Sequence, residues 1–201
     1  MPLARRRGLV AGFALLIGAT LAGRAAHAVD AGPIVIGDKN APVTITEYAS
    51  LDCPHCAAFQ TEVLPELRKR YLDAGKAKLE FHDFPLHEIA VRAAQLVHCA
   101  GPDRAEKFAD VIFRQQRSWE TAKDPLAALK QLVKLGGLSD DQINACLSDK
   151  ALEDAILQSR LEGEQKHEVD STPTFIIDGK KYAGTRSIDE LAQIIDPLLP
   201  K

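Results

Sequence analysis

This chain of 201 residues contains little methionine and only one pair of closely spaced cysteines. Met1 is the only methionine, which argues against a protein that carries copper on thioether ligands. Of the four cysteines, only Cys53 and Cys56 lie close together, because Cys99 and Cys146 form no second close pair. A zinc site would need two more ligands near the first two. The spacing therefore argues against a structural metal.

An apolar run of the roughly 18 residues that a membrane-spanning helix needs is also missing near the start of the chain. Leu9 to Leu21 is a shorter uncharged run, which follows three arginines and precedes Ala26-His27-Ala28. This order is typical of a secretory signal peptide. We expect cleavage after Ala28 and a periplasmic location. An uncleaved anchor is the alternative, and the choice between the general and the twin-arginine export routes stays open.

The chain has no excess of basic residues. It contains 25 Lys and Arg against 28 Asp and Glu, a formal charge of −3. Removal of residues 1–28 removes four arginines and no acid, which leaves 21 basic residues (25 minus 4) against 28 acids, a charge of −7. An acidic protein is a poor match for nucleic acid or an anionic membrane surface as its main partner. The remaining length fits one domain, with or without an insertion.

The first half of the pattern is strand, helix, strand. Alternation over residues 43–48 predicts a strand. Apolar residues at every fourth position predict a helix over residues 54–74, which Pro65 should kink. Residues 78–84 predict a second strand.

The second half is mostly helical and ends in a hairpin. Residues 88–166 carry helical apolar faces and a capping box at Ser139. Residues 173–177 and 180–183 predict two strands joined by an Asp-Gly turn. A capping box at Ser187 opens a last helix. The strands can form one sheet only if the helical block is an insertion, so the predicted class is α/β with an inserted helical domain.

The motif Cys53-Pro54-His55-Cys56 carries the chemistry. Pro54 suits the first position of a helix, where unpaired N–H groups stabilise a thiolate on Cys53. His55 can add positive charge. Because a stabilised thiolate favours the reduced protein, the disulfide becomes a stronger oxidant. Cys56, one turn further along, is the expected resolving thiol.

Other interpretations of the motif are weaker. A structural disulfide in so small a ring is strained, and half of a zinc site lacks its other ligands. A c-type haem site needs histidine directly after Cys56, where Ala57 stands. The motif therefore indicates thiol–disulfide exchange.

With its surroundings, the motif resembles the DsbA family of exported thiol:disulfide oxidoreductases in the thioredoxin superfamily. Glu47 lies six residues before Cys53, Thr172-Pro173 precedes the hairpin, and the helical block lies between. The resemblance implies a thioredoxin-like fold built from residues 29–87 and 167–201. Residues 88–166 would form the inserted helical domain, after a signal peptide over residues 1–28.

The resemblance also implies roles. A cis peptide bond at Thr172-Pro173 would leave the backbone of Thr172 free to bind an extended client strand. Glu47 would exchange a proton with Cys56. The oxidised protein would pass its disulfide to reduced client proteins through a mixed disulfide. A quinone-linked membrane partner resembling DsbB would reoxidise it. No metal and no organic cofactor is implied.

Two features depart from the family pattern. Thr172 stands where DsbA-type oxidases often have valine, and threonine there is common in thioredoxins and disulfide isomerases. A reductase or isomerase kept reduced is therefore an alternative, as is a non-catalytic client-binding, chaperone-like module. Cys99 and Cys146 are additional, and we predict a structural disulfide between them, with roughly 4 kcal/mol of stabilisation. His82 and His87 are interpreted as surface or hydrogen-bonded loop histidines.

Overall fold

The computed structural model describes residues 31–200, so the predicted signal peptide over residues 1–28 lies outside the described residues. The described chain contains one five-stranded sheet in the order β1-β3-β2-β4-β5. β2 and β3 are parallel, and the other neighbouring pairs are antiparallel. The strands are β1 (Ile34–Ile36), β2 (Val43–Ala49), β3 (Ala77–Asp83), β4 (Thr174–Ile177) and β5 (Lys180–Ala183).

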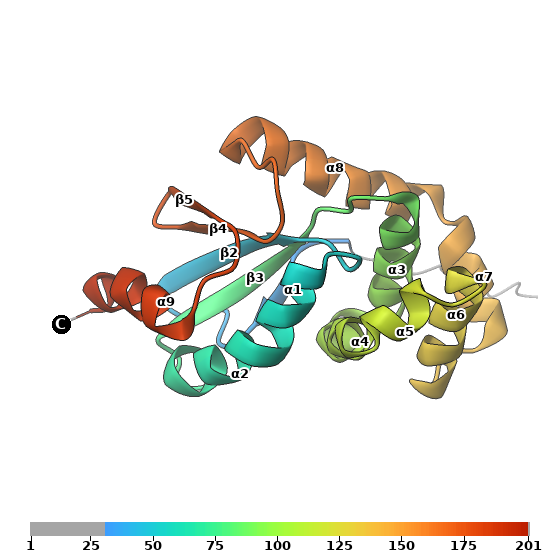
Figure 1. The fold of residues 1–201 in the computed structure, drawn as a ribbon, viewed down its shortest axis with the longest axis horizontal. Helices are drawn as coiled ribbons and strands as arrows, with labels where there is room; N and C mark the ends of the chain where they lie inside the picture. The colour runs from blue at the N-terminus through green and yellow to red at the C-terminus, as the bar shows by residue number, and fades with distance from the viewer. Residues whose placement is uncertain (1–30, 201) are drawn as a thin grey trace, which may run out of the picture.

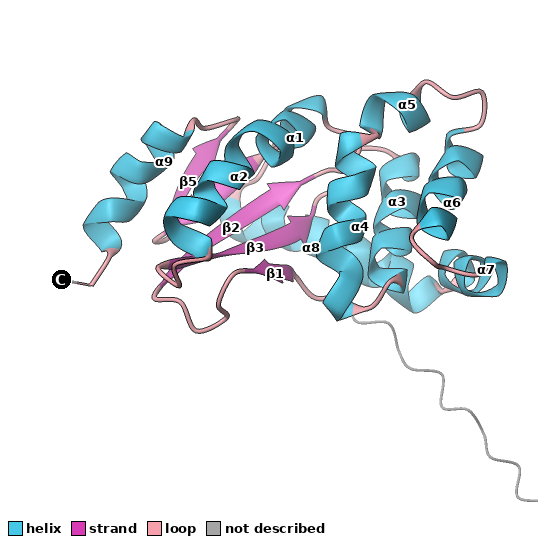
Figure 2. Ribbon diagram, turned by 90° about the horizontal axis from the view of Figure 1, so that it is seen from below, coloured by secondary structure: helices cyan, strands magenta, loops and turns pink. Residues whose placement is uncertain are grey.

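Helices cover both faces of the sheet (Figures 1 and 2). One face carries α1 (Pro54–Ala58), η1 (Phe59–Val63), α2 (Leu64–Leu67), η2 (Arg68–Leu72), α9 (Ile188–Ile195) and η3 (Asp196–Leu198). The opposite face carries α8 (Lys150–His167). Phe59 and Phe175 pack with ring centroids 4.8 Å apart, which fixes the first helix on β4.

The remaining helices form a block beyond one end of the sheet (Figure 1). They are α3 (Glu88–Cys99), α4 (Pro102–Arg114), α5 (Gln116–Glu120), α6 (Pro125–Leu135) and α7 (Asp140–Ser148). The buried Trp119 lies in this block and donates its indole N–H to the Ile112 carbonyl at 2.9 Å. Phe113 meets Phe81 of β3 edge to face. The apolar core of the block is therefore continuous with one end of the sheet.

The predicted α/β class with a helical insertion is confirmed, and β2, β3, the hairpin and the start of α9 occur within about one residue of their predicted positions. β1 was not predicted, because its three residues are too few to show an alternating pattern. The segment predicted as one kinked helix over residues 54–74 is helical from Pro54 to Leu72, and it contains two wide π-helical turns.

The first wide turn lies just before Pro65. Pro65 has no N–H for the carbonyl four residues back, and Leu64 donates its N–H to Phe59, five residues back. The Thr61 hydroxyl donates to the Ala57 carbonyl at 2.8 Å. The proline therefore widens the helix locally, as π-helical turns often do.

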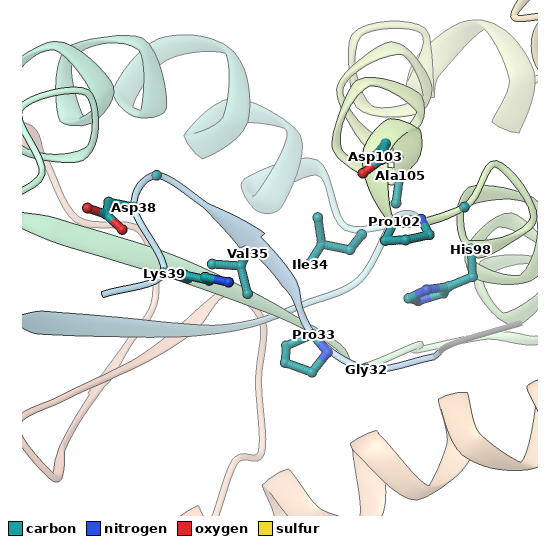
Figure 3. Close-up of a pocket in the computed structure, with 12 residues that line it drawn as sticks. Gly32, Pro33, Ile34, Val35, Asp38, Lys39, His98, Pro102, Asp103 and Ala105 are labelled. Carbon is teal, nitrogen blue, oxygen red and sulfur yellow. The ribbon is translucent and has the colours of Figure 1, made fainter. Parts of the chain in front are cut away.

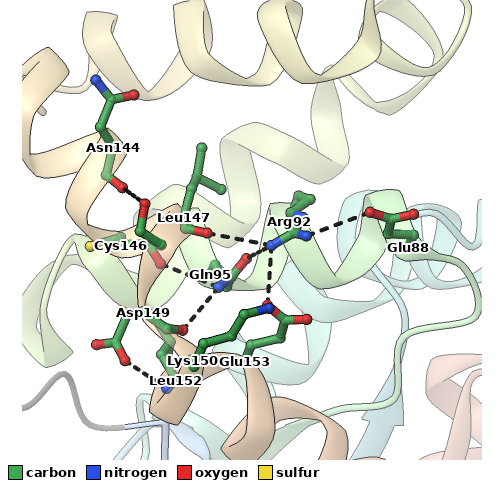
Figure 4. A network of polar contacts seen from close by, with 11 residues as sticks. Glu88, Arg92, Gln95, Asn144, Cys146, Leu147, Asp149, Lys150, Leu152 and Glu153 are labelled. Atoms are coloured by element: carbon green, nitrogen blue, oxygen red, sulfur yellow. Dashed lines mark hydrogen bonds and ion pairs between the residues drawn. The ribbon is translucent and has the colours of Figure 1, made fainter.

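A polar cluster holds the junction of α7 and α8 against α3 (Figure 4). The Gln95 amide donates to the carbonyls of Cys146 and Asp149, at 3.2 and 3.3 Å. Arg92 donates to the Gln95 side-chain oxygen at 3.0 Å and to the Leu147 carbonyl at 3.4 Å. These side chains add hydrogen bonds to carbonyls at the end of α7 and the start of α8, where the Cys146 and Asp149 carbonyls also accept the backbone N–H groups of Asp149 and Glu153.

A disulfide joins Cys99 of α3 to Cys146 of α7, the pairing predicted from the sequence, with Cα atoms 5.9 Å apart. Arg92, Gln95 and Cys99 are spaced by three and four residues, so they share one face of α3. The polar cluster and the disulfide therefore hold the same two helices together.

Candidate active site

Cys53 lies at the start of α1, where the end of β2 turns into the helix. It is the N-cap residue, with an extended backbone (φ −90°, ψ 119°), and Pro54 occupies the first turn. The Cys53 carbonyl accepts the first helical hydrogen bond, from the Ala57 N–H at 3.1 Å. Cys53 and Cys56 are free thiols in this structure, and both are buried. The first turn of the helix therefore surrounds the Cys53 sulfur with backbone N–H groups.

The Thr172–Pro173 peptide bond is cis and lies next to the motif. The Cys53 sulfur is 3.3 Å from the Thr172 carbonyl oxygen, which accepts a hydrogen bond from the sulfur when Cys53 is protonated. The two loops meet because β2 and β4 are antiparallel neighbours, with Tyr48 opposite Thr174. The end of β2 and the start of β4 therefore lie at the same edge of the sheet.

The two motif sulfurs have opposite electrostatic surroundings. The pKa of Cys53 is lowered to about 5, chiefly by a hydrogen bond from the Cys56 side chain, with help from the backbone N–H groups of Cys56 and His55. Burial raises the pKa of Cys56 far above its usual value, and its hydrogen bond to Cys53 and the charge of Glu47 raise it further. At neutral pH the reduced site therefore holds a Cys53 thiolate beside a Cys56 thiol.

The sequence suggested that His55 adds positive charge near Cys53, but the structure shows a different contribution to the Cys53 pKa. Its side chain is exposed at the second position of α1. Its effect on the pKa of Cys53 comes from its backbone N–H. The helix start therefore stabilises the thiolate through main-chain donors, in line with the partial positive charge at a helix N-terminus.

Glu47 lies on β2 and is only 1% exposed. Burial raises its pKa to about 8, and the Cys53 charge contributes to this rise. Within the described chain, its Oε2 atom has no hydrogen-bond partner. A carboxyl group with this pKa is mostly protonated at neutral pH. Its electrostatic effect on Cys56 places it near the buried sulfur.

One side chain that holds the motif in place was not foreseen from the sequence. It comes from the helical block. The Gln116 amide at the start of α5 donates to the carbonyls of Leu51 and Cys53, at 2.8 and 3.0 Å. No sequence pattern marks Gln116, because its partners lie 65 and 63 residues away. A side chain of the helical block therefore helps to hold the loop before Cys53 in place.

A second polar group lies on the other side of that loop. Asp52 accepts a hydrogen bond from the Ser50 hydroxyl, and its Oδ2 atom is 2.6 Å from His87 Nδ1. The Leu86 N–H donates to the Ser50 hydroxyl at 3.0 Å. His87 was interpreted from the sequence as a surface or hydrogen-bonded loop histidine, but its partner Asp52 was not foreseen.

Two other kinds of site are not found in residues 31–200. No group of three or more His, Cys, Asp or Glu side chains there is arranged to hold a metal ion. No helix of that segment has the length and apolar character needed to cross a membrane. A pocket of about 640 Å³ lies between β1 and the start of α4, with His98 on its wall (Figure 3), and neither motif cysteine lines it.

Fold and site together define a thioredoxin-fold protein with a Cys-x-x-Cys motif beside a cis-proline. The family model described as Thioredoxin matches residues 30–197. Among solved structures, Wolbachia pipientis alpha-DsbA1 superposes with a TM-score of 0.77 and 31% identity, covering 83% of this chain and 90% of that one. The chain belongs to the DsbA family of the thioredoxin superfamily.

Curated relatives carry related names. A Rickettsia felis protein, under the provisional name protein-disulfide oxidoreductase, is 31% identical over 173 residues, 85% of this chain and 62% of that protein. Disulfide bond formation protein D of Bacillus subtilis is 26% identical over 173 residues, 82% of this chain and 76% of that protein. The chain spans 62–65% of the length of the Rickettsia relatives that it matches.

Proposed function

We propose that this protein is an exported thiol:disulfide oxidoreductase that donates its Cys53–Cys56 disulfide to reduced client proteins. The contrast between the two sulfurs carries the proposal. Cys53 lies beside the Thr172 backbone with its pKa lowered to about 5, whereas Cys56 is buried with its pKa raised. A low pKa for Cys53 stabilises the reduced protein, so the oxidised form is a good acceptor of electrons from client thiols.

The proposed reaction uses the sulfurs in order. A client thiolate attacks the Cys53 sulfur and forms a mixed disulfide, while the Cys53–Cys56 bond breaks. Cys56 leaves with the electron pair and takes a proton, which the buried and mostly protonated Glu47 supplies. A second client thiolate then attacks the client sulfur, which closes the client disulfide and releases the Cys53 thiolate. Both disulfide exchanges proceed without a metal or an organic cofactor.

The surroundings of the site support a protein substrate. The backbone of Thr172 borders the Cys53 sulfur, and an extended client segment can pair with such a backbone as an added strand. We propose that residues 29–87 and 167–201 form the catalytic domain and that residues 88–166 form the insertion. Family membership supports export and reoxidation by a quinone-linked membrane protein resembling DsbB.

A second candidate is a disulfide isomerase or reductase that is kept reduced in the same compartment. Thr172 before the cis-proline favours it, because oxidases of the family often carry valine there. The two candidates share the site and the mixed disulfide, and they differ in the direction in which electrons flow.

The reduction potential of Cys53–Cys56, measured against a glutathione buffer, separates these functions. An oxidase should lie well above the roughly −270 mV of thioredoxin, toward the roughly −120 mV of a strong oxidant. A value near that of thioredoxin would overturn the oxidase proposal.

Trapping of a mixed disulfide tests whether the protein exchanges disulfides with clients at all. Cys56→Ala should accumulate mixed disulfides with clients that carry a disulfide, because the Cys53 thiolate attacks that disulfide, one client sulfur leaves as a thiolate, and no Cys56 thiol is present to release the bound client. Cys53→Ala is the matched control and should trap none. Failure of Cys56→Ala to trap any client would favour a non-catalytic binding module.

A further inference from the structure

His87 has the setting of a general base, although it lies outside the Cys-x-x-Cys motif. It precedes α3, and its side chain is 76% exposed, whereas that of Asp52 is 4% exposed. Its Nδ1 atom is 2.6 Å from Asp52 Oδ2. Its Nε2 atom has no hydrogen-bond partner in residues 31–200. One ring nitrogen is thus held by a buried carboxylate, while the other faces solvent.

The position of this pair relative to Cys53 is fixed. Asp52 directly precedes Cys53 in the chain. The Ser50 hydroxyl contacts Asp52 and accepts the Leu86 N–H, so it ties the loop before Cys53 to the loop that carries His87. These bonds hold the two loops together.

Two acidic side chains besides Asp52 lie near His87, on α5 and α3. Burial raises the pKa of Glu120 on α5, Asp52 and Cys53 raise it further, and His87 lowers it. Glu120 is therefore within electrostatic range of the other three groups. Glu88, which follows His87 on α3, is paired with Arg92. The His87 ring therefore has the Asp52 carboxylate in contact and the Glu120 carboxyl within electrostatic range.

The proton that needs a base belongs to the client. Cys53 loses its own proton readily, since its pKa is about 5. An ordinary cysteine, with a pKa of about 8.5, is only about 3% thiolate at pH 7. A buried carboxylate that accepts the Nδ1 proton of a histidine leaves Nε2 free to accept another, which is the arrangement that activates nucleophiles in hydrolases.

We propose that His87, oriented by Asp52, accepts the proton of the client thiol as the client sulfur attacks Cys53; this rests on the proposed function. The client S–H bond breaks and its proton moves to His87 Nε2. A bond forms between the client sulfur and Cys53, the Cys53–Cys56 bond breaks, and Cys56 takes the electron pair and a proton from Glu47. In the reverse direction the imidazolium protonates the departing client thiolate.

The test compares two thiols in single-turnover reactions with the oxidised full chain at pH 7. One is a cysteine-containing peptide, and the other is 4-mercaptobenzoate, an aromatic thiol that is mostly ionised at this pH and is still a competent reductant. His87→Gln should slow the peptide by about tenfold, and by no more than roughly 30-fold, because the 3% of thiolate still reacts. The deficit should shrink as the pH rises toward 9, and 4-mercaptobenzoate should react at the wild-type rate.

Controls separate catalysis from structure. Asp52→Asn should slow the peptide selectively as well, because it removes the carboxylate that orients the ring. His82→Gln, on β3, should change neither rate. Equal slowing of both thiols by His87→Gln would indicate a binding or folding role and would overturn the proposal, as would no slowing of either. If the wild-type protein oxidises neither thiol, the proposed function itself fails.

Discussion

The Cys53 sulfur and the Thr172 carbonyl oxygen lie 3.3 Å apart, although 119 positions separate them in the chain. The sheet explains this contact, because the antiparallel pairing of β2 and β4 brings the end of one strand to the start of the other. Under the proposed function, the Cys53 sulfur would thus border a length of backbone with which an extended client segment pairs. A client bound there would present its cysteine to Cys53.

The first prediction concerns the thiolate. In the reduced protein, absorbance at 240 nm should report ionisation of Cys53 with a midpoint near pH 5. The Cys56 side chain is the largest cause of the low pKa, and a hydrogen bond to a charged group contributes about 1.5–3 kcal/mol. Cys56→Ala should therefore raise the midpoint by roughly one to two pH units.

Cys56→Ser provides the matched control for that experiment. The serine hydroxyl can still donate to the Cys53 thiolate, so its midpoint should lie between those of the wild type and Cys56→Ala. An unchanged midpoint in Cys56→Ala would show that the backbone N–H groups alone stabilise the thiolate.

The second prediction concerns Glu47 and the pH dependence of stability. Its pKa is about 8 in the folded protein against 4.5 as the ordinary value, so the folded state holds the proton more tightly. Stability from this group is complete below pH 4.5 and is lost as the pH rises toward 8, at up to about 1.4 kcal/mol per pH unit. Urea denaturation of the oxidised protein between pH 5 and 8 measures this slope.

Glu47→Gln should flatten that slope, because the amide does not titrate. The oxidised form is the right one to use, since it lacks the Cys53 charge while burial, the larger cause, remains. Glu88→Gln removes an exposed carboxylate and should keep the wild-type slope. Identical slopes in Glu47→Gln and the wild type would mean that Glu47 is already ionised in the fold.

Local patterns predicted the elements of this fold well. The alternation over residues 43–48, the Asp178-Gly179 turn and the Ser187 capping box each depend on neighbours in sequence, and each has its expected structure. The three residues of β1 were missed because such a strand depends on its pairing with β3 rather than on any pattern of its own.

The site was only partly predictable for the same physical reason. Cys53 and Cys56 were identified from their spacing, and Glu47 and Thr172-Pro173 were identified from the resemblance to the family. The contacts of Gln116 with Cys53 and of His87 with Asp52 span 63 and 35 residues. Such contacts depend on how the helical block packs against the sheet, and no short pattern encodes them.

The third prediction concerns the polar cluster on α3. Gln95 is fully buried and donates to the carbonyls of Cys146 and Asp149. Gln95→Leu would remove these two buried hydrogen bonds, although each carbonyl keeps one backbone donor, so the free energy of unfolding should fall by about 1–3 kcal/mol. Gln158→Leu, at an exposed position of α8, should change it by about 0.5 kcal/mol or less. A loss no larger than that of the control would show that the backbone N–H groups of Asp149 and Glu153 satisfy these carbonyls on their own.

The last prediction concerns the close approach of α8 to the sheet at Gly163. A Cβ atom there would lie 2.8 Å from Tyr48 Cε1 and 2.9 Å from Cδ1. Tyr48 is 4% exposed and meets Phe84 edge to face, so its ring has little room to move. Alanine is favoured over glycine in a helix by about 1 kcal/mol, but overpacking costs about 1–3 kcal/mol. We therefore expect Gly163→Ala to lower the free energy of unfolding.

Two further variants test that packing argument. Gln165→Ala, two residues along the same helix and exposed, should change stability by about 0.5 kcal/mol or less. Tyr48→Leu should cost less in the Gly163→Ala background than in the wild type, because the smaller side chain relieves the clash, and such coupling between neighbours is measurable in a double-mutant cycle. A gain of about 1 kcal/mol in Gly163→Ala would mean that helix propensity outweighs the Tyr48 contact, and that α8 can move away from the sheet at little cost.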